Sequence, residues 1–343
     1  MVANAAAGNS PVGQPRPSVI RPALLASTLT YADNTTQSVN IPRSEVLRYI
    51  QIDISCQPTA AAGWTAANLG AADAASIFTD LQLIRNGGDI HTEMTGEIAM
   101  LLANRWYGST QFSSVGTVGT ANPVLTATIL IPFETPNIRK PFSTMFNTGK
   151  CSGVTLQASF GNYATVLSTA TAWTAAPTFT ITLGFEFWPP NAQKQDTTPI
   201  FFFRRFKKHA YTIPAGTQTD FPVTVPLNTV YHGFLLNGAI MATANKIKLS
   251  SGSTTIQTWS IPGKGNLQRL RRNVNPTLGV TSTASNNANT YWLEVMPDGM
   301  TTQLLNARGI SDLSFLLSTG PTNPGGTLTW YSSEIFGTDY ITG

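Results

Sequence analysis

The chain has 343 residues, enough for two domains of ordinary size, and only 11% of them are charged while 42% are hydrophobic. A net charge of +4, from 21 basic and 17 acidic residues, is too small to mark the chain by itself as a nucleic-acid binder. Because the cores of protein interfaces are depleted of charge, this composition favours a surface that neighbouring subunits cover.

Residues 1–17 consist mainly of Ala, Gly, Asn and Pro, and they lack the basic and apolar regions of a secretory signal. We expect an N-terminal arm that is disordered alone and ordered by a neighbour. No apolar run approaches the ~20 residues needed to span a bilayer, so we expect synthesis in the cytoplasm. Cys56 and Cys151 form neither a disulfide framework nor a zinc set, and we expect two buried, reduced thiols.

Beyond the arm, short alternating or β-branched runs recur between Gly, Pro, Asn and Ser, a pattern typical of an all-β sandwich or barrel. Examples of the predicted strands, in chain order, are Ser38–Ile41, Tyr49–Ile54, Leu125–Ile131, Val154–Phe160, Phe179–Phe187, Phe221–Val225, Tyr291–Val295, Leu313–Leu317 and Thr327–Ile335. One amphipathic helix is predicted over Gly96–Trp106, and a second short helix is expected over Gly265–Arg272.

Five sequence blocks recur in the same order in the two halves of the chain, which indicates an internal duplication. In the first block, Pro42 and Val46 match Pro226 and Val230 at the same spacing. The other matches are Leu83–Gly87 with Lys248–Gly252, Ile131-Pro132 with Met296-Pro297, Asn147–Gly149 with Asn306–Gly309, and Thr180–Leu183 plus Glu186 with Thr327–Trp330 plus Glu334. Two longer loops in the first half, over residues 60–76 and 162–177, explain the differences in spacing.

The segment Trp188–Pro199 contains three prolines and polar residues without periodicity, which is typical of a linker. We therefore predict four parts: an arm at 1–17, a first β domain at 18–188, a linker at 189–199 and a second β domain at 200–343.

These features together resemble the double jelly-roll major capsid proteins of tailless, membrane-containing icosahedral phages of the corticovirus and tectivirus type. The basic and aromatic run Phe203–Lys208, which leads into the second β domain, is similar to the corticovirus-type protein. Leu83–Gly87 followed by the helix at Gly96–Trp106 resembles part of its first barrel. The resemblance covers residues ~18–343 as a pattern and rests on no invariant motif.

The resemblance implies an all-β fold of two tandem eight-stranded jelly-roll barrels with short helices in the loops. It implies a structural virion protein with no catalytic activity and no cofactor, assembled as pseudo-hexagonal homotrimers that tile an icosahedral shell over an internal lipid membrane. The expected partners are further copies of the chain, penton or minor capsid proteins and the membrane. Specific contact with nucleic acid is not expected.

Asp89, His91 and Glu93 alternate, so on a regular strand they would lie on one face, where they could hold a divalent ion. The alternative, which we favour, is a solvated strand or loop after the Gly87-Gly88 turn.

Two groups of basic residues are the other candidate sites. Lipid headgroups or nucleic-acid phosphates could bind them, or they could form pairs between subunits or between barrels. They are Arg204, Arg205, Lys207 and Lys208, which follow the linker, and Arg269, Arg271 and Arg272, which fall on the expected second helix.

Two other classes of function compete with a capsid role. A carbohydrate-binding or adhesin β-sandwich would use exposed aromatic side chains for sugar stacking, and its candidates are Trp64, Trp106, Trp173 and Trp259. An enzyme on a jelly-roll scaffold ranks last, because the acidic residues are dispersed and no nucleophile-elbow or zinc-protease motif occurs.

Overall fold

The computed structural model describes residues 19–20, 27–43, 46–60, 73–107, 113–115, 125–133, 145–163, 173–188, 202–260, 290–295 and 304–337. The predicted arm, the predicted linker and the expected helix at 265–272 lie outside these residues, so the limits of the arm and the linker stay predictions.

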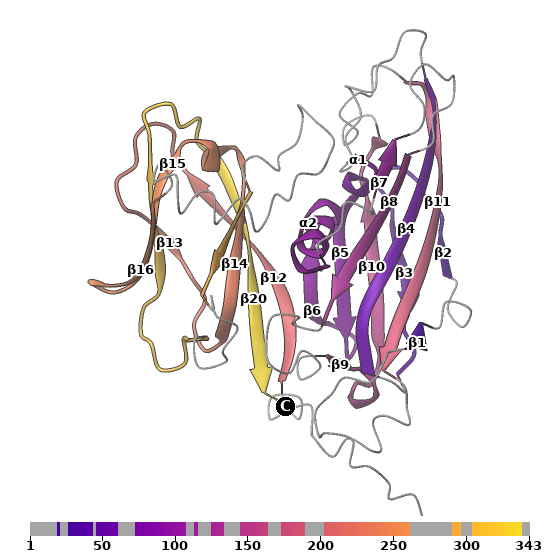
Figure 1. The fold of residues 1–343 in the computed structure, drawn as a ribbon, viewed down its shortest axis with the longest axis horizontal. Coiled ribbons are helices and arrows are strands. Elements are labelled where there is room, and N and C mark those ends of the chain that lie inside the picture. The colour runs from indigo at the N-terminus through magenta and orange to yellow at the C-terminus, as the bar shows by residue number, and fades with distance from the viewer. Residues whose placement is uncertain are drawn as a thin grey trace, which may run out of the picture.

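The first half of the chain forms two antiparallel sheets, which we call barrel 1 (Figure 1). One sheet has the order β1-β11-β4-β8-β7, with β2 also on β11 and β9 on β4, and the other has the order β3-β10-β5-β6. The strands are β1 (Val19–Ile20), β2 (Ser27–Leu29), β3 (Thr36–Asn40), β4 (Val46–Ala60), β5 (Phe78–Arg85), β6 (Asp89–Met94), β7 (Ser113–Val115), β8 (Leu125–Pro132), β9 (Phe146–Asn147), β10 (Val154–Phe160) and β11 (Trp173–Trp188), and the helices are α1 (Asp73–Ser76), α2 (Gly96–Tyr107) and the 3₁₀ turn η4 (Thr148–Lys150).

The second half forms two further antiparallel sheets, which we call barrel 2. Their orders are β12-β20-β14-β17, with β18 on β14, and β13-β19-β15-β16. The elements are β12 (Phe202–Ile213), β13 (Phe221–Thr224), β14 (Val230–Asn237), η6 (Ala239–Ala242), β15 (Ala244–Ser251), β16 (Thr254–Ser260), β17 (Thr290–Glu294), β18 (Leu305–Asn306), β19 (Ser314–Thr319) and β20 (Gly326–Gly337).

The two barrels repeat one plan, which confirms the predicted duplication. In sheet order, β3-β10-β5-β6 corresponds to β13-β19-β15-β16, and β11-β4-β8 corresponds to β20-β14-β17. The place of β12 on β20 is taken in barrel 1 by β1 and β2 on β11. The short strands β7, β9 and β18 are additions to the eight strand positions expected for each jelly roll.

The repeat extends to single residues. Val46 in β4 pairs with Asn147 in β9, and Val230 in β14 pairs with Asn306 in β18. In both halves the asparagine side chain accepts a hydrogen bond at 3.0 Å from the backbone N–H two residues later. Such a local turn needs a short side chain with an acceptor oxygen, which explains why the sequence repeats an asparagine there.

Two details of the predicted repeat need correction. The match of Leu183 with Trp330 holds. Leu183 pairs with Ile52 and Trp330 pairs with Leu236, and these partners lie six residues after the matched Val46 and Val230. By the same count, the position of Glu186 matches that of Ser333, one residue before Glu334. The predicted loop over residues 162–177 is also shorter than expected, because β11 begins at Trp173, where it pairs with the extended end of β4.

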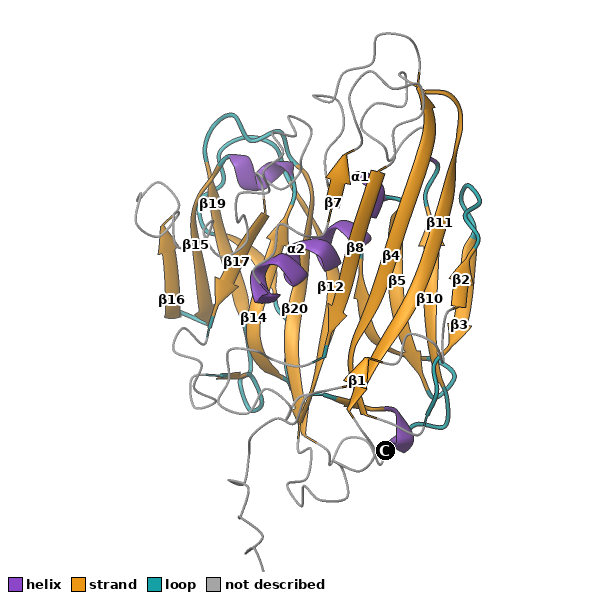
Figure 2. Ribbon diagram, turned by 45° about the vertical axis from the view of Figure 1, so that its right-hand side comes forward, coloured by secondary structure: helices purple, strands orange, loops and turns teal. Residues whose placement is uncertain are grey.

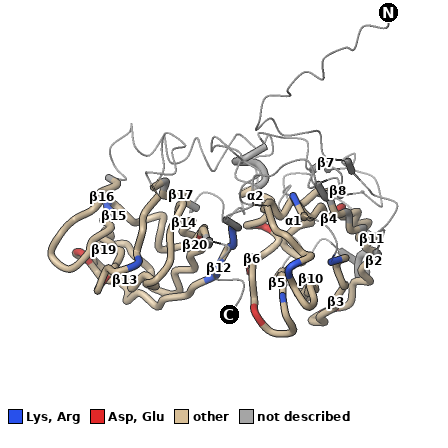
Figure 3. The backbone as a smooth tube through the Cα atoms, turned by 90° about the horizontal axis from the view of Figure 1, so that it is seen from below, with Lys and Arg blue, Asp and Glu red and all other residues tan. Residues whose placement is uncertain are grey.

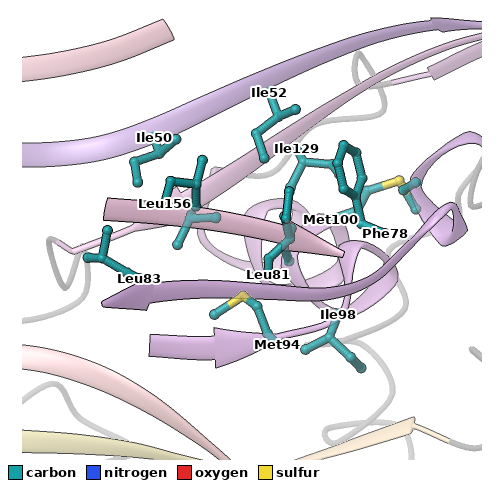
Figure 4. Packing of buried hydrophobic residues seen from close by; sticks show 14 of the residues in the cluster. Ile50, Ile52, Phe78, Leu81, Leu83, Met94, Ile98, Met100, Ile129 and Leu156 are labelled. Carbon is teal, nitrogen blue, oxygen red and sulfur yellow. The ribbon is translucent and has the colours of Figure 1, made fainter. Parts of the chain in front are cut away.

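The core of barrel 1 lies between its two sheets, as the alternation of β10 requires: every second residue from Val154 to Phe160 is buried. Figure 4 shows Ile50, Ile52 and Leu156 among the apolar side chains that fill this space. Cys56 and Cys151 are buried free thiols, as expected, and burial raises the pKa of Cys56 to about 12.

The barrels stand side by side, and α2 lies on the side of barrel 1 that faces barrel 2 (Figures 1 and 2). The apolar cluster of barrel 1 continues into barrel 2 through four side chains, Phe206, Leu235, Trp292 and Tyr331. Around these four residues, the sheet β12-β20-β14-β17 is therefore covered on both faces, one toward its own core and one toward barrel 1.

Candidate functional site: the contact between the barrels

The edge strand β12 of barrel 2 lies beside the edge strand β6 of barrel 1 (Figure 1). The Lys207 Nζ donates a hydrogen bond to the backbone oxygen of Ile90 in β6. The next residue, Lys208, has its Nζ 3.9 Å from a carboxylate oxygen of Asp80 in β5. Burial, assisted by the nearby Arg205 charge, lowers the pKa of Lys207. The two lysines therefore reach across from one barrel to the other.

Arg204 is the most deeply buried cation of this contact, with 0% of its surface exposed. Its Nη2 donates to the backbone oxygen of Pro132, at the end of β8, over 2.9 Å. Its guanidinium carbon lies 5.0 Å from the centre of the Phe206 ring. Since a buried charge needs polar partners, this arginine holds a specific arrangement of β12 against β8.

Arg205 belongs to a polar network within barrel 2. Its Nε donates to Oε2 of Glu334 over 2.7 Å, and the other carboxylate oxygen accepts from the Ser332 hydroxyl over 2.7 Å. The Ser332 oxygen lies 3.1 Å from Nε2 of His209, whose ring stacks on Trp330 at 4.0 Å between centroids. Burial lowers the pKa of His209, which favours its neutral form in this stack.

The structure thus places Arg204, Lys207 and Lys208 in the contact between barrels, and Arg205 beside it. Within the chain, Arg204, Lys207 and Lys208 contact barrel 1, while Arg205 pairs with Glu334 of its own barrel. Binding of lipid headgroups, nucleic acid or another subunit by this cluster stays a prediction. Arg269, Arg271 and Arg272 lie outside the described residues, and their role stays a prediction.

An apolar patch completes the contact. Trp292, Leu235 and Tyr331 lie next to one another across β17, β14 and β20, and each is about 1% exposed. Gly233 lets the indole lie flat on the sheet, because a Cβ at that position would be 2.5 Å from Cζ2 of Trp292. The Tyr331 side chain forms a hydrogen bond with Thr95, at the start of α2.

Sequence reasoning missed this patch, although a signal was present. Residues 234–236 of β14 and 291–293 of β17 are apolar without alternation, and all of them are buried. A strand that is apolar on both sides is covered on both sides, which an antiparallel barrel wall facing solvent would not be.

The structure separates the three candidate metal ligands. In the pairing of β5 with β6, Leu83 faces Thr92 and Ile84 faces Ile90, so His91 is the extra residue of a β-bulge. The bulge places Asp89, opposite Arg85, and Glu93, opposite Gln82, on different faces of the sheet. The prediction of one shared face is therefore wrong.

Each of the three residues has its own surroundings. Asp89 forms an ion pair with Arg85. His91 is buried, and the centroid of its ring lies 4.4 Å from that of Phe146. Burial raises the pKa of Glu93. Among the residues that the structure describes, no group of three His, Cys, Asp or Glu side chains is arranged to hold a metal ion.

Of the four candidate sugar-stacking tryptophans, the structure describes the side chain of one. Trp259 lies in β16 and is 6% exposed, as part of the core of barrel 2. Trp173 lies in β11 and Trp106 in α2, and Trp64 falls outside the described residues.

In the part of the chain that is described, no helix is long and apolar enough to cross a membrane.

No protein-family model and no curated protein matches the sequence. Solved structures do match the fold. The chain aligns with the STIV major capsid protein at 12% identity and a TM-score of 0.65, over 93% of this chain and 98% of that one. It aligns with the major capsid protein P2 from bacteriophage PM2 at 11% identity and a TM-score of 0.55, over 90% of this chain and 96% of that one. With a chain of the PBCV-1 virus capsid it aligns at 11% identity and a TM-score of 0.55, over 93% of this chain and 94% of that one.

These alignments span both barrels and the contact between them. Over almost its whole length, this chain has the double jelly-roll fold of viral major capsid proteins.

Proposed function

We propose that this chain is the major capsid protein of an icosahedral virus, with a structural role in the virion. The observation that carries the proposal is the duplication of a complete jelly roll in one chain, aligned over 98% of the length of a capsid protein. Fold alone does not assign a function, and the composition of the chain supports the capsid role. Only 11% of residues are charged, which suits a surface that neighbouring subunits cover.

The finer proposal is a homotrimer. Two similar barrels in each chain give three copies a pseudo-hexagonal outline, and such units can tile a shell by repeated contacts between identical surfaces. The shell would enclose an internal lipid membrane and include penton or minor capsid proteins, and the chain would be made in the host cytoplasm. These last points rest on the resemblance described above.

The oligomeric state of the purified chain tests this proposal. Sedimentation velocity over a range of concentrations should show a trimer, and electron microscopy should show particles with a six-sided outline. A chain that stays monomeric at high concentration would contradict the proposal. Lipid extraction from intact particles would test the membrane separately, because a lipid-free shell leaves the capsid role intact.

A further inference from the structure

The contact between the barrels differs in composition from the cores of the barrels. The core of barrel 2 is a separate cluster of buried side chains, and among the described residues four join barrel 2 to the core of barrel 1. Beside that apolar patch lie buried and half-buried charged groups, and Figure 3 shows basic residues of β12 between the barrels. Buried charges regain their hydration when a contact opens, so we expect the barrels to separate at a lower cost than either barrel unfolds.

The imidazole of His91 lies where the charges of the two barrels meet. It is 1% exposed, and the backbone oxygen of its neighbour Ile90 accepts the hydrogen bond from Lys207 of barrel 2. Within barrel 1, the centroid of its ring lies 4.4 Å from that of Phe146 and 5.9 Å from that of Phe133. Barrel 1 therefore supplies aromatic rings to this histidine, and barrel 2 supplies a cation beside it.

The charged groups around His91 come from both barrels. Burial, together with the charges of Arg85, Arg205 and Lys207, lowers the pKa of His91 well below its ordinary range. The charged groups in and around the contact are Asp80 and Arg85 in β5, Asp89 and Glu93 in β6, Arg204, Arg205, Lys207 and Lys208 in β12, and Glu334 in β20. These are five cations and four carboxylates, so an imidazolium would add a positive charge to a cluster that already has one in excess.

We propose that the contact between the barrels is an acid-sensitive joint, in which protonation of His91 loosens barrel 2 from barrel 1 while each barrel keeps its own fold. Separation moves Arg205 and Lys207 away from the imidazole, so the open form binds the proton more tightly than the closed form. A proton shifts the equilibrium only through this difference in affinity. The inference concerns a single chain, and it holds whether or not that chain assembles as a capsid protein.

The direction and size of the effect follow from proton linkage. His91 stays neutral in the closed form and has an ordinary pKa of about 6.5 in the open form, so the open form takes up the proton as the pH falls. Between about pH 7.5 and pH 5.5, this uptake raises the fraction of open molecules about tenfold. Burial raises the pKa of Asp80 and of Glu93, and their protonation acts in the opposite direction, so the test stays at or above about pH 5.5.

Two neighbouring serines of β20 provide matched reporters of opening. Ser332 and Ser333 are both 0% exposed, and as successive strand residues they point to opposite faces of the sheet. Ser333 pairs with Phe206, on the face toward barrel 1, whereas Ser332 donates to Glu334 and approaches His209 on the opposite face. A thiol introduced by Ser333→Cys therefore reports opening of the contact, and one introduced by Ser332→Cys reports opening of barrel 2 itself.

The measurement is the rate at which a pyridyl disulfide labels each thiol in the full chain. Each rate is divided by the rate for the same chain unfolded in urea at the same pH, which removes the effect of pH on the thiol. For Ser333→Cys we expect this ratio to rise about tenfold between about pH 7.5 and pH 5.5. At the lower pH, the ratio for Ser332→Cys should stay at least about tenfold below it, because barrel 2 remains closed. The buried Cys56 and Cys151 report on barrel 1 and should stay unlabelled.

Neutral replacements of His91 test the role of the proton. Combined with Ser333→Cys, both His91→Phe and His91→Gln should remove the rise, because neither side chain titrates. His209→Gln is the control, because the His209 ring stacks on Trp330 within barrel 2, and there the rise should persist.

Three results would overturn the proposal. They are a ratio for Ser333→Cys that does not change with pH, a rise that persists in both His91 variants, and equal ratios for the two introduced thiols at both pH values. The last result would mean that the barrels unfold together and do not separate. Leu235→Cys, on the same face as Ser333 and 1% exposed, is a second reporter if Ser333→Cys does not fold.

Discussion

The outer faces of two equivalent sheets, β11-β4-β8 in barrel 1 and β20-β14-β17 in barrel 2, share one fold and differ in their side chains. Leu235 and Tyr331 in barrel 2 occupy the positions of Gln51 and Gly184 in barrel 1. In barrel 1, the Asp53 carboxylate accepts hydrogen bonds from Gln51 and Thr128, each at 2.7 Å. The duplication keeps the inner faces apolar because each barrel needs a core. What covers the outer face decides the residues there.

The largest expected effect tests this comparison at one matched pair. Leu235→Ala should lower the free energy of unfolding by about 2–5 kcal/mol, because Leu235 is 1% exposed and its removal leaves a cavity between the barrels. Gln51→Ala, at the equivalent half-buried position, should cost less than about 1 kcal/mol. Urea denaturation of both variants gives the two values. Similar losses would mean that the two faces are covered to the same extent.

A smaller effect is expected at Gly233, whose counterpart in barrel 1 is Tyr49. Gly233→Ala should cost about 1–3 kcal/mol, because the new Cβ would overlap the Trp292 ring. Gly88→Ala is the control, since a Cβ there meets nothing within 4 Å. Thermal unfolding together with tryptophan fluorescence would follow both stability and the displacement of the indole. An unchanged Gly233→Ala variant would show that the indole is free to move aside.

The smallest effect concerns His91, the buried bulge residue of β6. Burial, together with the charges of Arg85, Arg205 and Lys207, lowers the pKa of His91 well below its ordinary range. A histidine with a lowered folded-state pKa binds more protons when unfolded. Its contribution to stability is therefore complete above the unfolded pKa of about 6.5 and is lost as the pH falls below that value. We expect the urea concentration at the midpoint of unfolding to fall as the pH is lowered from 7.5 to 5.5.

His91→Phe should reduce this dependence on pH, because a phenyl ring fits beside Phe133 and Phe146 and does not titrate. The carboxylates nearby act in the opposite direction. Burial raises the pKa of Asp80 and of Glu93, so their protonation favours the folded state as the pH falls. If the variant and the wild type lose stability in parallel over this range, His91 is not the group responsible.

Most of the fold could be predicted from local patterns in the sequence. Alternation in runs such as Val154–Phe160, and the repeated asparagine turns at Asn147 and Asn306, depend on neighbouring residues and on one buried face. The predicted strands and the helix at Gly96–Trp106 follow from the same rule. Their order in the two halves was enough to predict the duplication, because each half must close its own core from the same sequence of elements.

The tertiary structure alone decided how the site is built. The run from Arg204 to Lys208 has the composition of a membrane-binding, nucleic-acid-binding or interface segment, and only the tertiary structure shows that it contacts Pro132, Ile90 and Asp80 of barrel 1. Those partners lie more than 70 residues away in the chain. The bulge at His91 likewise depends on the register between β5 and β6. A sequence records which faces of a strand are apolar, but the charges and bulges on an outer face have meaning only beside the surface that covers them.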